Sequence, residues 1–172
     1  MLRCALITSV VLFANVARSQ AESPLKPGDM VILECLGDNA EKDGKRYLNG
    51  QTKEGVVGLA AETGRRFSGT KWKVVKLDKG GFGFECQGNL NGDRWLDGRT
   101  GVGTVGLAPK TGGRFTGTNW KVHDRGDGTI QLECLGEMEG PRWLNGLTAD
   151  AAAQLTDDHK LSGTFWKVRK AE

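Results

Sequence analysis

The chain has 172 residues, of which 26% are charged, and its 24 Lys and Arg nearly balance its 21 Asp and Glu. A nucleic-acid-binding protein normally has a clear basic excess or a basic run, and neither is present, so we expect no nucleic-acid partner. No segment beyond residue 21 is apolar over the length that a membrane span requires, so we expect no membrane span.

The first 21 residues have the pattern of a secretory signal peptide. An early arginine precedes the apolar stretch Cys4–Val16, and small residues at Ser19 and Ala21 predict cleavage after Ala21. The mature protein, residues 22–172, is then a secreted, extracellular single domain. Cleavage removes two arginines and one cysteine, which leaves 22 basic residues against 21 acidic ones and three cysteines.

The mature sequence contains one unit three times, at about 28–79, 80–127 and 128–172. The matching segments, in chain order, are Ile32–Gly37, Arg46–Gly50, Val56–Ala60 and Phe67–Val74 in the first copy, Gly83–Gly88, Arg94–Gly98, Thr104–Ala108 and Phe115–Val122 in the second, and Gln131–Gly136, Arg142–Gly146, Ala152–Thr156 and Leu161–Val168 in the third. Self-similarity at a fixed period is the signature of a repeat architecture.

Each copy predicts four β-strands, because short apolar runs are separated by clusters of Gly, Asp, Asn and Thr. The runs also alternate: Ile130, Leu132 and Cys134 share one face, and Gln131 and Glu133 share the other. Twelve strands in three four-stranded units predict an all-β protein with the β-trefoil fold, six strands forming a barrel and six hairpin strands capping it. Propellers and solenoids are the competing repeat architectures, but three blades fall below the usual range of a propeller, whereas a trefoil closes at three units.

Large apolar residues at equivalent places predict a symmetric core. They are Trp72, Trp120, Trp166, Leu48, Leu96, Leu144, Phe67 and Phe115. We expect Cys35, Cys86 and Cys134 to act as small buried hydrophobes; since their number is odd, at least one thiol stays free or pairs between chains. The competing hypothesis has the three sulfurs converge on the threefold axis around a soft metal, but the sequence has no CxxC motif or histidine cluster, so we expect no metal and no cofactor.

Each copy has a lysine in its last run and a glutamate in its first run. The lysines are Lys73, Lys121 and Lys167, and the glutamates are Glu34, Glu85 and Glu133. We expect these residues to pair across strands, which would cancel a cationic surface for sulfated glycans. Arg46, Arg94 and Arg142 have no matching acid in the repeat pattern and are the better candidates to contact an anion.

The hairpin residues Asn49, Asp97 and Asn145 each precede a glycine, and Asn-Gly and Asp-Gly favour tight turns. A turn therefore accounts for them without a ligand. No His lies near a repeated Ser or Cys together with an orienting acid, and the sequence has no phosphate loop and no HExxH motif. We therefore expect no enzymatic activity.

The segment Asn119–Ile130 and the following Arg142–Asn145 resemble the ricin-B-like lectin repeat, in which a QxW strand precedes a GDGTI turn and a C-L-D hairpin. Fascin-like trefoils have a similar rhythm. The resemblance implies a β-trefoil and a sugar held by the hairpin Asp, an aromatic platform on the third strand and an Asn before the QxW motif. Asp97 matches the hairpin acid, whereas Ala108 and Gly117 occupy the other two positions.

We therefore expect a secreted, non-catalytic binding module whose ligand is a carbohydrate, held at shallow, quasi-equivalent hairpin sites. An aromatic ring would stack on the sugar, Asn or Asp would accept hydroxyl hydrogens, and Arg would donate. The candidate ligand-binding residues are Asp97, Arg99, Trp95, Arg94, Tyr47, Asn49, Trp143 and Asn145. The alternative is a structural or protein-interaction trefoil, fascin-like or inhibitor-like, whose partner is a protein; complete burial of the Tyr47, Trp95 and Trp143 rings would favour it.

Overall fold

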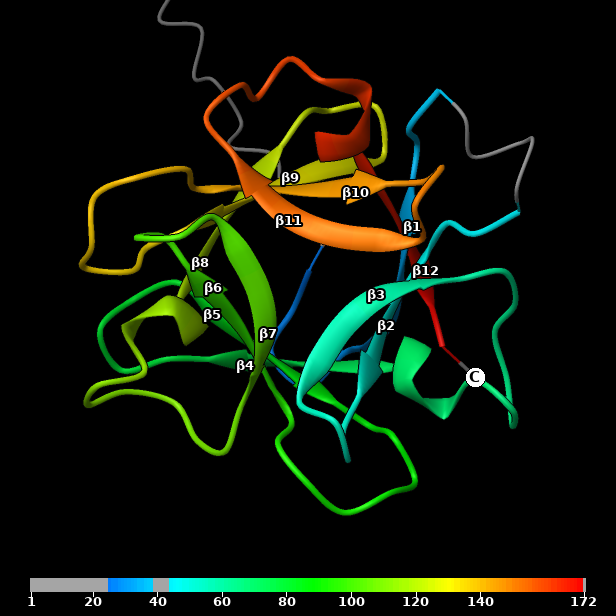
Figure 1. Ribbon diagram of the computed structural model, residues 1–172, viewed down its shortest axis with the longest axis horizontal. Coiled ribbons are helices and arrows are strands. Elements are labelled where there is room, and N and C mark those ends of the chain that lie inside the picture. The colour runs from blue at the N-terminus through cyan, green and yellow to red at the C-terminus, as the bar shows by residue number, and fades with distance from the viewer. Residues whose placement is uncertain (1–24, 39–43, 172) are drawn as a thin grey trace, which may run out of the picture.

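The computed structural model describes residues 25–38 and 44–171 (Figure 1). The strands are β1 (Met30–Cys35), β2 (Tyr47–Gln51), β3 (Val56–Ala60), β4 (Trp72–Lys76), β5 (Phe82–Cys86), β6 (Trp95–Arg99), β7 (Thr104–Ala108), β8 (Trp120–Asp124), β9 (Thr129–Cys134), β10 (Trp143–Leu147), β11 (Ala152–Thr156) and β12 (Trp166–Lys170). They lie at the four places per repeat that the sequence predicts. The predicted signal peptide lies outside the described residues.

A one-turn 3-10 helix precedes the last strand of every repeat, which the sequence analysis did not predict. These helices are η1 (Ser68–Thr70), η2 (Thr116–Thr118) and η3 (Ser162–Thr164). A Ser-Gly-Thr or Thr-Gly-Thr tripeptide forms each of them, too short a segment for any helical periodicity. In the part of the chain that the structure describes, no helix is long and apolar enough to cross a bilayer.

Six strands close into a barrel, because each one pairs antiparallel with two others in the ring β1–β4–β5–β8–β9–β12. Every repeat contributes its first and last strand. The ladders between consecutive repeats, β4–β5, β8–β9 and β12–β1, have five residue pairs each, whereas those within a repeat have one or two. The barrel is therefore held mainly by contacts between repeats.

The remaining strands form three hairpins, β2–β3, β6–β7 and β10–β11, each with five residue pairs. Strands β3, β7 and β11 also pair with one another and surround the centre of the view in Figure 1. A barrel with three hairpins around a pseudo-threefold axis is a trefoil-like arrangement.

The core uses the same residue types in every repeat. Trp72, Trp120 and Trp166 are fully buried. The indole N–H of each donates to a hairpin leucine carbonyl, that of Leu48, Leu96 and Leu144 respectively, at 2.9, 2.9 and 3.1 Å. Because each indole both fills apolar space and satisfies its polar N–H, it ties the barrel to a hairpin. The prediction of a symmetric Trp and Leu core is confirmed.

The prediction that Phe67 and Phe115 belong to this core is wrong. Both side chains are half-buried and lie outside the central apolar cluster. Each residue immediately precedes a 3-10 helix, at its N-cap. The chain turns there, so the ring is left at the surface beside the helix.

Candidate functional site

Two hairpins border shallow pockets of the same construction. The first, about 220 Å³, lies between β2 at Asn49, helix η1 and the loop after β5 at Asn89. The second, about 490 Å³, lies between β10 at Asn145, helix η3 and the chain after β1 at Asp38. Each pocket therefore lies where one repeat meets the next. We call them the Asn49 pocket and the Asn145 pocket, and we call the equivalent place in the middle repeat the Asp97 site.

The floor of each site is backbone. In the Asn49 pocket a Cβ added to Gly69 would come within 2.7 Å of the Asn49 Oδ1, and one added to Gly50 would lie 2.7 Å from the Cys86 Sγ. Real Cβ atoms do not approach that closely, so a side chain at either glycine would push its neighbour aside. The equivalent glycines of the other repeats have the same contacts.

A buried thiol lies beneath each floor. The Cys86 Sγ is 3.5 Å from the carbonyl oxygens of both Gly50 and Gly69, and Cys134 and Cys35 contact equivalent glycine carbonyls. Burial raises the pKa of all three thiols, that of Cys134 to about 11, so at neutral pH they stay protonated.

The cysteines are unpaired, and each belongs to its own site. Each is fully buried, as the buried-hydrophobe prediction requires. Within residues 25–38 and 44–171, no group of three or more His, Cys, Asp and Glu side chains is arranged to hold a metal ion.

A hydroxyl in each 3-10 helix ties the next repeat to the site. The Ser68 Oγ accepts the backbone N–H of Asn89 at 3.0 Å. The equivalent pairs are Thr116 with Glu137, at 3.2 Å, and Ser162 with Asp38, at 3.3 Å. Because these hydroxyls act as acceptors, their own hydrogens are left to donate on the pocket wall.

Each of the two pockets presents a neutral hairpin amide beside charged side chains of both signs. Asn49 is half-buried and Asn145 is buried, and each lines its pocket. Exposed Arg66 lines the Asn49 pocket and exposed Lys160 lines the Asn145 pocket. Phe67 adds a half-buried aromatic ring to the Asn49 pocket. The Asn49 pocket thus combines hydrogen-bond donors and acceptors with an apolar surface.

The Asp97 site carries a charge instead. Asp97 is 8% exposed, and its Oδ2 lies 3.8 Å from the Nε of exposed Arg99. Burial raises the pKa of Asp97, and Arg99 opposes that shift. A Cβ added to Gly106 would lie 3.3 Å from the Arg99 guanidinium, so this side chain extends over β7. The structure therefore places Asp97 and Arg99, two of the candidate residues, close together in the middle hairpin.

The three predicted stacking rings are half-buried: Tyr47, Trp95 and Trp143. Trp95 covers Gly83, where an added Cβ would lie 3.0 Å from the ring. Trp143 packs between His123 and His159, with ring centroids at 4.9 and 5.3 Å. The rings are not fully buried, but they do not line the two hairpin pockets. The aromatic residue that does is Phe67, which only its position directly before the Ser-Gly-Thr turn could have indicated.

The three predicted anion-contact arginines are engaged within the fold. The Arg94 guanidinium donates to the carbonyls of Cys86, Gly88 and Leu90 at 2.9–3.0 Å, and Arg142 donates to the equivalent carbonyls at 2.8–3.1 Å. Arg46 pairs with Glu34 at 3.4 Å, so the expectation that it lacks an acid is wrong. The repeat pattern could not indicate this role, because main-chain carbonyls have no sequence signature.

The predicted pairing of glutamates with lysines is found in part. The Glu133 carboxylate lies 3.8 Å from the Lys121 Nζ. Glu34 is the cross-strand neighbour of Lys167, but it accepts a hydrogen bond from the Arg169 Nε at 2.6 Å. The acids of the barrel wall thus offset part of the basic surface, through arginine as well as lysine.

No protein-family model matches the sequence, and no curated protein matches it. Solved structures do resemble the fold. The designed threefold-symmetric protein ThreeFoil matches with a TM-score of 0.61 and 18% identity, over 83% of this chain and 99% of that one. A salivary protein of Culex quinquefasciatus from the Cysteine and Tryptophan-Rich family matches with a TM-score of 0.59 and 15% identity, over 88% of this chain and 100% of that one.

A GlcNAcα1-4Gal-releasing endo-β-galactosidase from Clostridium perfringens also matches, with a TM-score of 0.64 and 13% identity. The match covers 84% of this chain and 33% of the galactosidase chain, so the likeness concerns a third of that enzyme. At identities this low, the three matches establish an all-β, trefoil-like fold and nothing about activity.

Proposed function

We propose that this chain is a secreted, non-catalytic carbohydrate-binding module with the β-trefoil fold and a ricin-B-like arrangement of three hairpin sites. The observation that carries the proposal is one site built three times: an Asn or Asp side chain beside a glycine floor where two repeats meet. The signal-peptide pattern of residues 1–21 supports the secretion part of the proposal.

The chemistry of the Asn49 pocket suits a sugar. A sugar hydroxyl both donates and accepts, and the Asn49 amide can do both in return. Arg66 and Ser68 supply further donors, and Phe67 supplies the apolar face on which the C–H side of a pyranose ring can pack. Such a set fixes the orientation of a small polar ligand at a shallow site.

The mode of binding differs from the one that the ricin-B-like resemblance implies. That mode uses an aromatic platform on the third strand, where this chain has buried Ala108, and an Asn where it has floor glycine Gly117. In our proposal Phe67, from the segment before η1, replaces the platform, and the hairpin residue keeps its role as the central hydrogen-bonding group. Asp97, with Arg99, is the hairpin acid that the resemblance retains.

Two further considerations support the proposal. The similar endo-β-galactosidase is, by its name, a protein that acts on carbohydrate. Three sites on one chain also raise the apparent affinity for a multivalent glycan, even where each site alone is weak. Shallow pockets are therefore compatible with useful binding to a glycan-covered surface.

One observation favours a second candidate, a protein-interaction trefoil that binds no sugar. Val102 and Met138 are 73% and 66% exposed. The loop at Gly101 lies against Met138, since an added Cβ would be 3.5 Å from the Met138 Cβ. These apolar side chains near the Asp97 site would suit a protein partner.

The deciding experiment is a glycan array with the purified protein and with the triple variant Asn49→Ala, Asp97→Ala, Asn145→Ala. We expect the wild type to bind a defined set of glycans and the triple variant to lose them while staying folded. The matched control is Val102→Asp with Met138→Asp, which should leave glycan binding unchanged. Folded wild-type protein that binds no glycan would remove the carbohydrate proposal and leave the protein-interaction candidate.

A further inference from the structure

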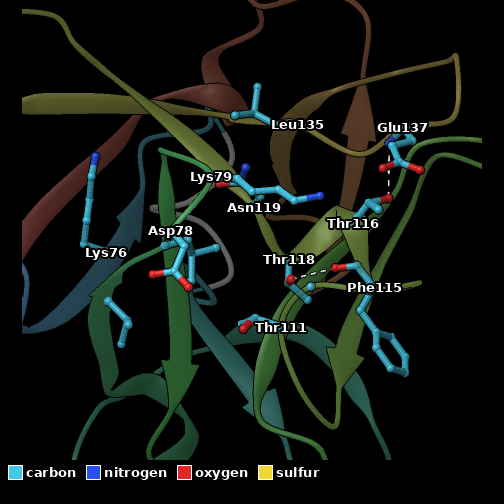
Figure 2. Close-up of a pocket in the computed structure, with 14 residues that line it drawn as sticks. Lys76, Asp78, Lys79, Thr111, Phe115, Thr116, Thr118, Asn119, Leu135 and Glu137 are labelled. Atoms are coloured by element: carbon cyan, nitrogen blue, oxygen red, sulfur yellow. Dashed lines mark hydrogen bonds between the residues drawn. The ribbon is translucent and has the colours of Figure 1, made fainter.

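A third pocket, about 470 Å³, lies apart from the three hairpin residues (Figure 2). We call it the repeat-2 pocket. The β4–β5 turn at Leu77 forms one wall, the loop that leads into η2 forms another, and Leu135 lies at its edge. Figure 2 shows the Phe115 ring pointing away from the pocket centre, so the apolar lining comes chiefly from aliphatic side chains of the barrel strands and turns.

One side chain that lines the pocket, Asn119, has a buried acceptor without a donor. Among the described residues, the Asn119 Oδ1 is the buried side-chain polar atom with no hydrogen-bond partner. It lies against Gly81, whose lack of a side chain makes room for it. An unsatisfied buried acceptor costs stability. Because this oxygen has no partner, a turn of the amide toward a donor in the pocket would cost the oxygen no hydrogen bond.

The equivalent place one repeat further along the chain is filled. Arg125 is equivalent to Leu77, because it lies 48 residues further on, the spacing of the hairpin glycines. Phe165 is equivalent to Asn119, because it lies 46 residues further on, the spacing of Trp120 and Trp166. There the Arg125 guanidinium lies 3.8 Å from the centroid of the Phe165 ring and occupies the space between them. Leucine and asparagine at these two positions leave that space open in the repeat-2 pocket.

We propose that the repeat-2 pocket binds a small, uncharged, largely apolar molecule that carries one N–H or O–H donor for the Asn119 Oδ1. Val75, Leu77 and Leu135 provide the apolar contact. The exposed charges at the pocket balance, with Lys76 and Lys79 against Asp78 and Glu137, which favours a neutral ligand over an ion. The pocket contains none of the three hairpin residues, although Thr116 and Glu137, which connect η2 to the Asp97 site, also line it.

The test compares indole with N-methylindole, a matched pair that differs in the N–H donor. Each is titrated into isotope-labelled protein while amide proton–nitrogen correlation spectra are recorded. We expect indole to shift the side-chain amide signal of Asn119 and the backbone amides of Leu77 and Leu135, and to saturate. N-methylindole should bind about tenfold more weakly, the effect of one hydrogen bond. Equal affinity, or shifts that leave Asn119, Leu77 and Leu135 unchanged, would overturn the proposal.

Two variants distinguish the contribution of the apolar pocket wall to indole binding from that of the Asn119 acceptor. Leu77→Arg places in this pocket the residue found at the equivalent position 125 and should abolish saturable indole shifts. Asn119→Leu keeps the pocket apolar and should make the two probes bind equally. Arg125→Leu, at the equivalent position directly after β8, is the control and should leave indole affinity unchanged. The spectra report whether each variant is folded; a folded Leu77→Arg protein that still binds indole at the same amides contradicts the proposal, whatever the glycan array shows.

Discussion

Beneath the hairpins, the three repeats use the same residue types at the same places, with a buried Trp, a buried Leu and a buried Cys in each. Around the pockets they diverge, since the hairpin residue is Asn49 or Asn145 in two repeats and Asp97 in the other. The barrel closes through ladders between repeats, so a change in one core copy strains its neighbours. The residues around the pockets are not constrained by these ladders, so they can differ between repeats and give the sites different ligand preferences.

The largest test of this comparison is truncation of a core tryptophan. Trp120→Ala removes a fully buried ring and its hydrogen bond to Leu96 and should cost about 3–5 kcal/mol of unfolding free energy. The symmetric description requires Trp72→Ala and Trp166→Ala to cost similar amounts. Urea denaturation of the three variants measures this, and a loss below about 1 kcal/mol for any of them would show that its repeat packs differently.

A smaller loss is expected at the glycine floor. In Gly98→Ala the new Cβ would lie 2.6 Å from the Cys134 Sγ and 3.0 Å from the Trp120 ring, and such overpacking costs about 1–3 kcal/mol. Gly101→Ala is the matched control in the same hairpin, because its Cβ would meet Met138 at an ordinary 3.5 Å, and it should change stability by less than about 0.5 kcal/mol. Thermal unfolding of both variants measures this difference in stability. Equal stability of the two variants would contradict the close packing described at Gly98.

The core was predictable from the sequence because burial leaves a periodic trace. Alternation and the repeated Trp, Leu and Cys positions predicted twelve strands, and the structure has them. The site was less predictable, since its groups are defined by tertiary contacts. The main-chain carbonyls that accept hydrogen bonds from Arg94 have no sequence signature. Phe67 is a large apolar residue of the kind expected in a core, but it lies at a turn.

The smallest effect concerns the one hairpin that carries a charge. Burial raises the pKa of Asp97 in the folded state above its usual 3.8. At pH values between the unfolded-state pKa and the raised folded-state pKa, the folded protein therefore holds more protons than the unfolded protein, and its stability falls as pH rises. Asp97→Asn, which copies the other hairpins, should remove this slope and stabilise the protein near neutral pH by less than about 1 kcal/mol. Denaturation curves from acidic to neutral pH measure it.

Asn49→Asp is the reciprocal variant, which gives the first hairpin the charge of the middle one. It should introduce a slope of the same sign, and a weaker one because Asn49 is only half-buried. An Asp97→Asn protein whose stability keeps the wild-type dependence on pH would show that solvent reaches the carboxylate freely.

The central claim is that the three hairpin sites bind carbohydrate. The most direct measurement is calorimetric titration of the purified protein with a monovalent form of its best array glycan. We predict binding at more than one site per chain, reduced in turn by Asn49→Ala, Asp97→Ala and Asn145→Ala and abolished by the triple variant, with the unfolding transition retained. Undiminished glycan binding by the folded triple variant would contradict the account.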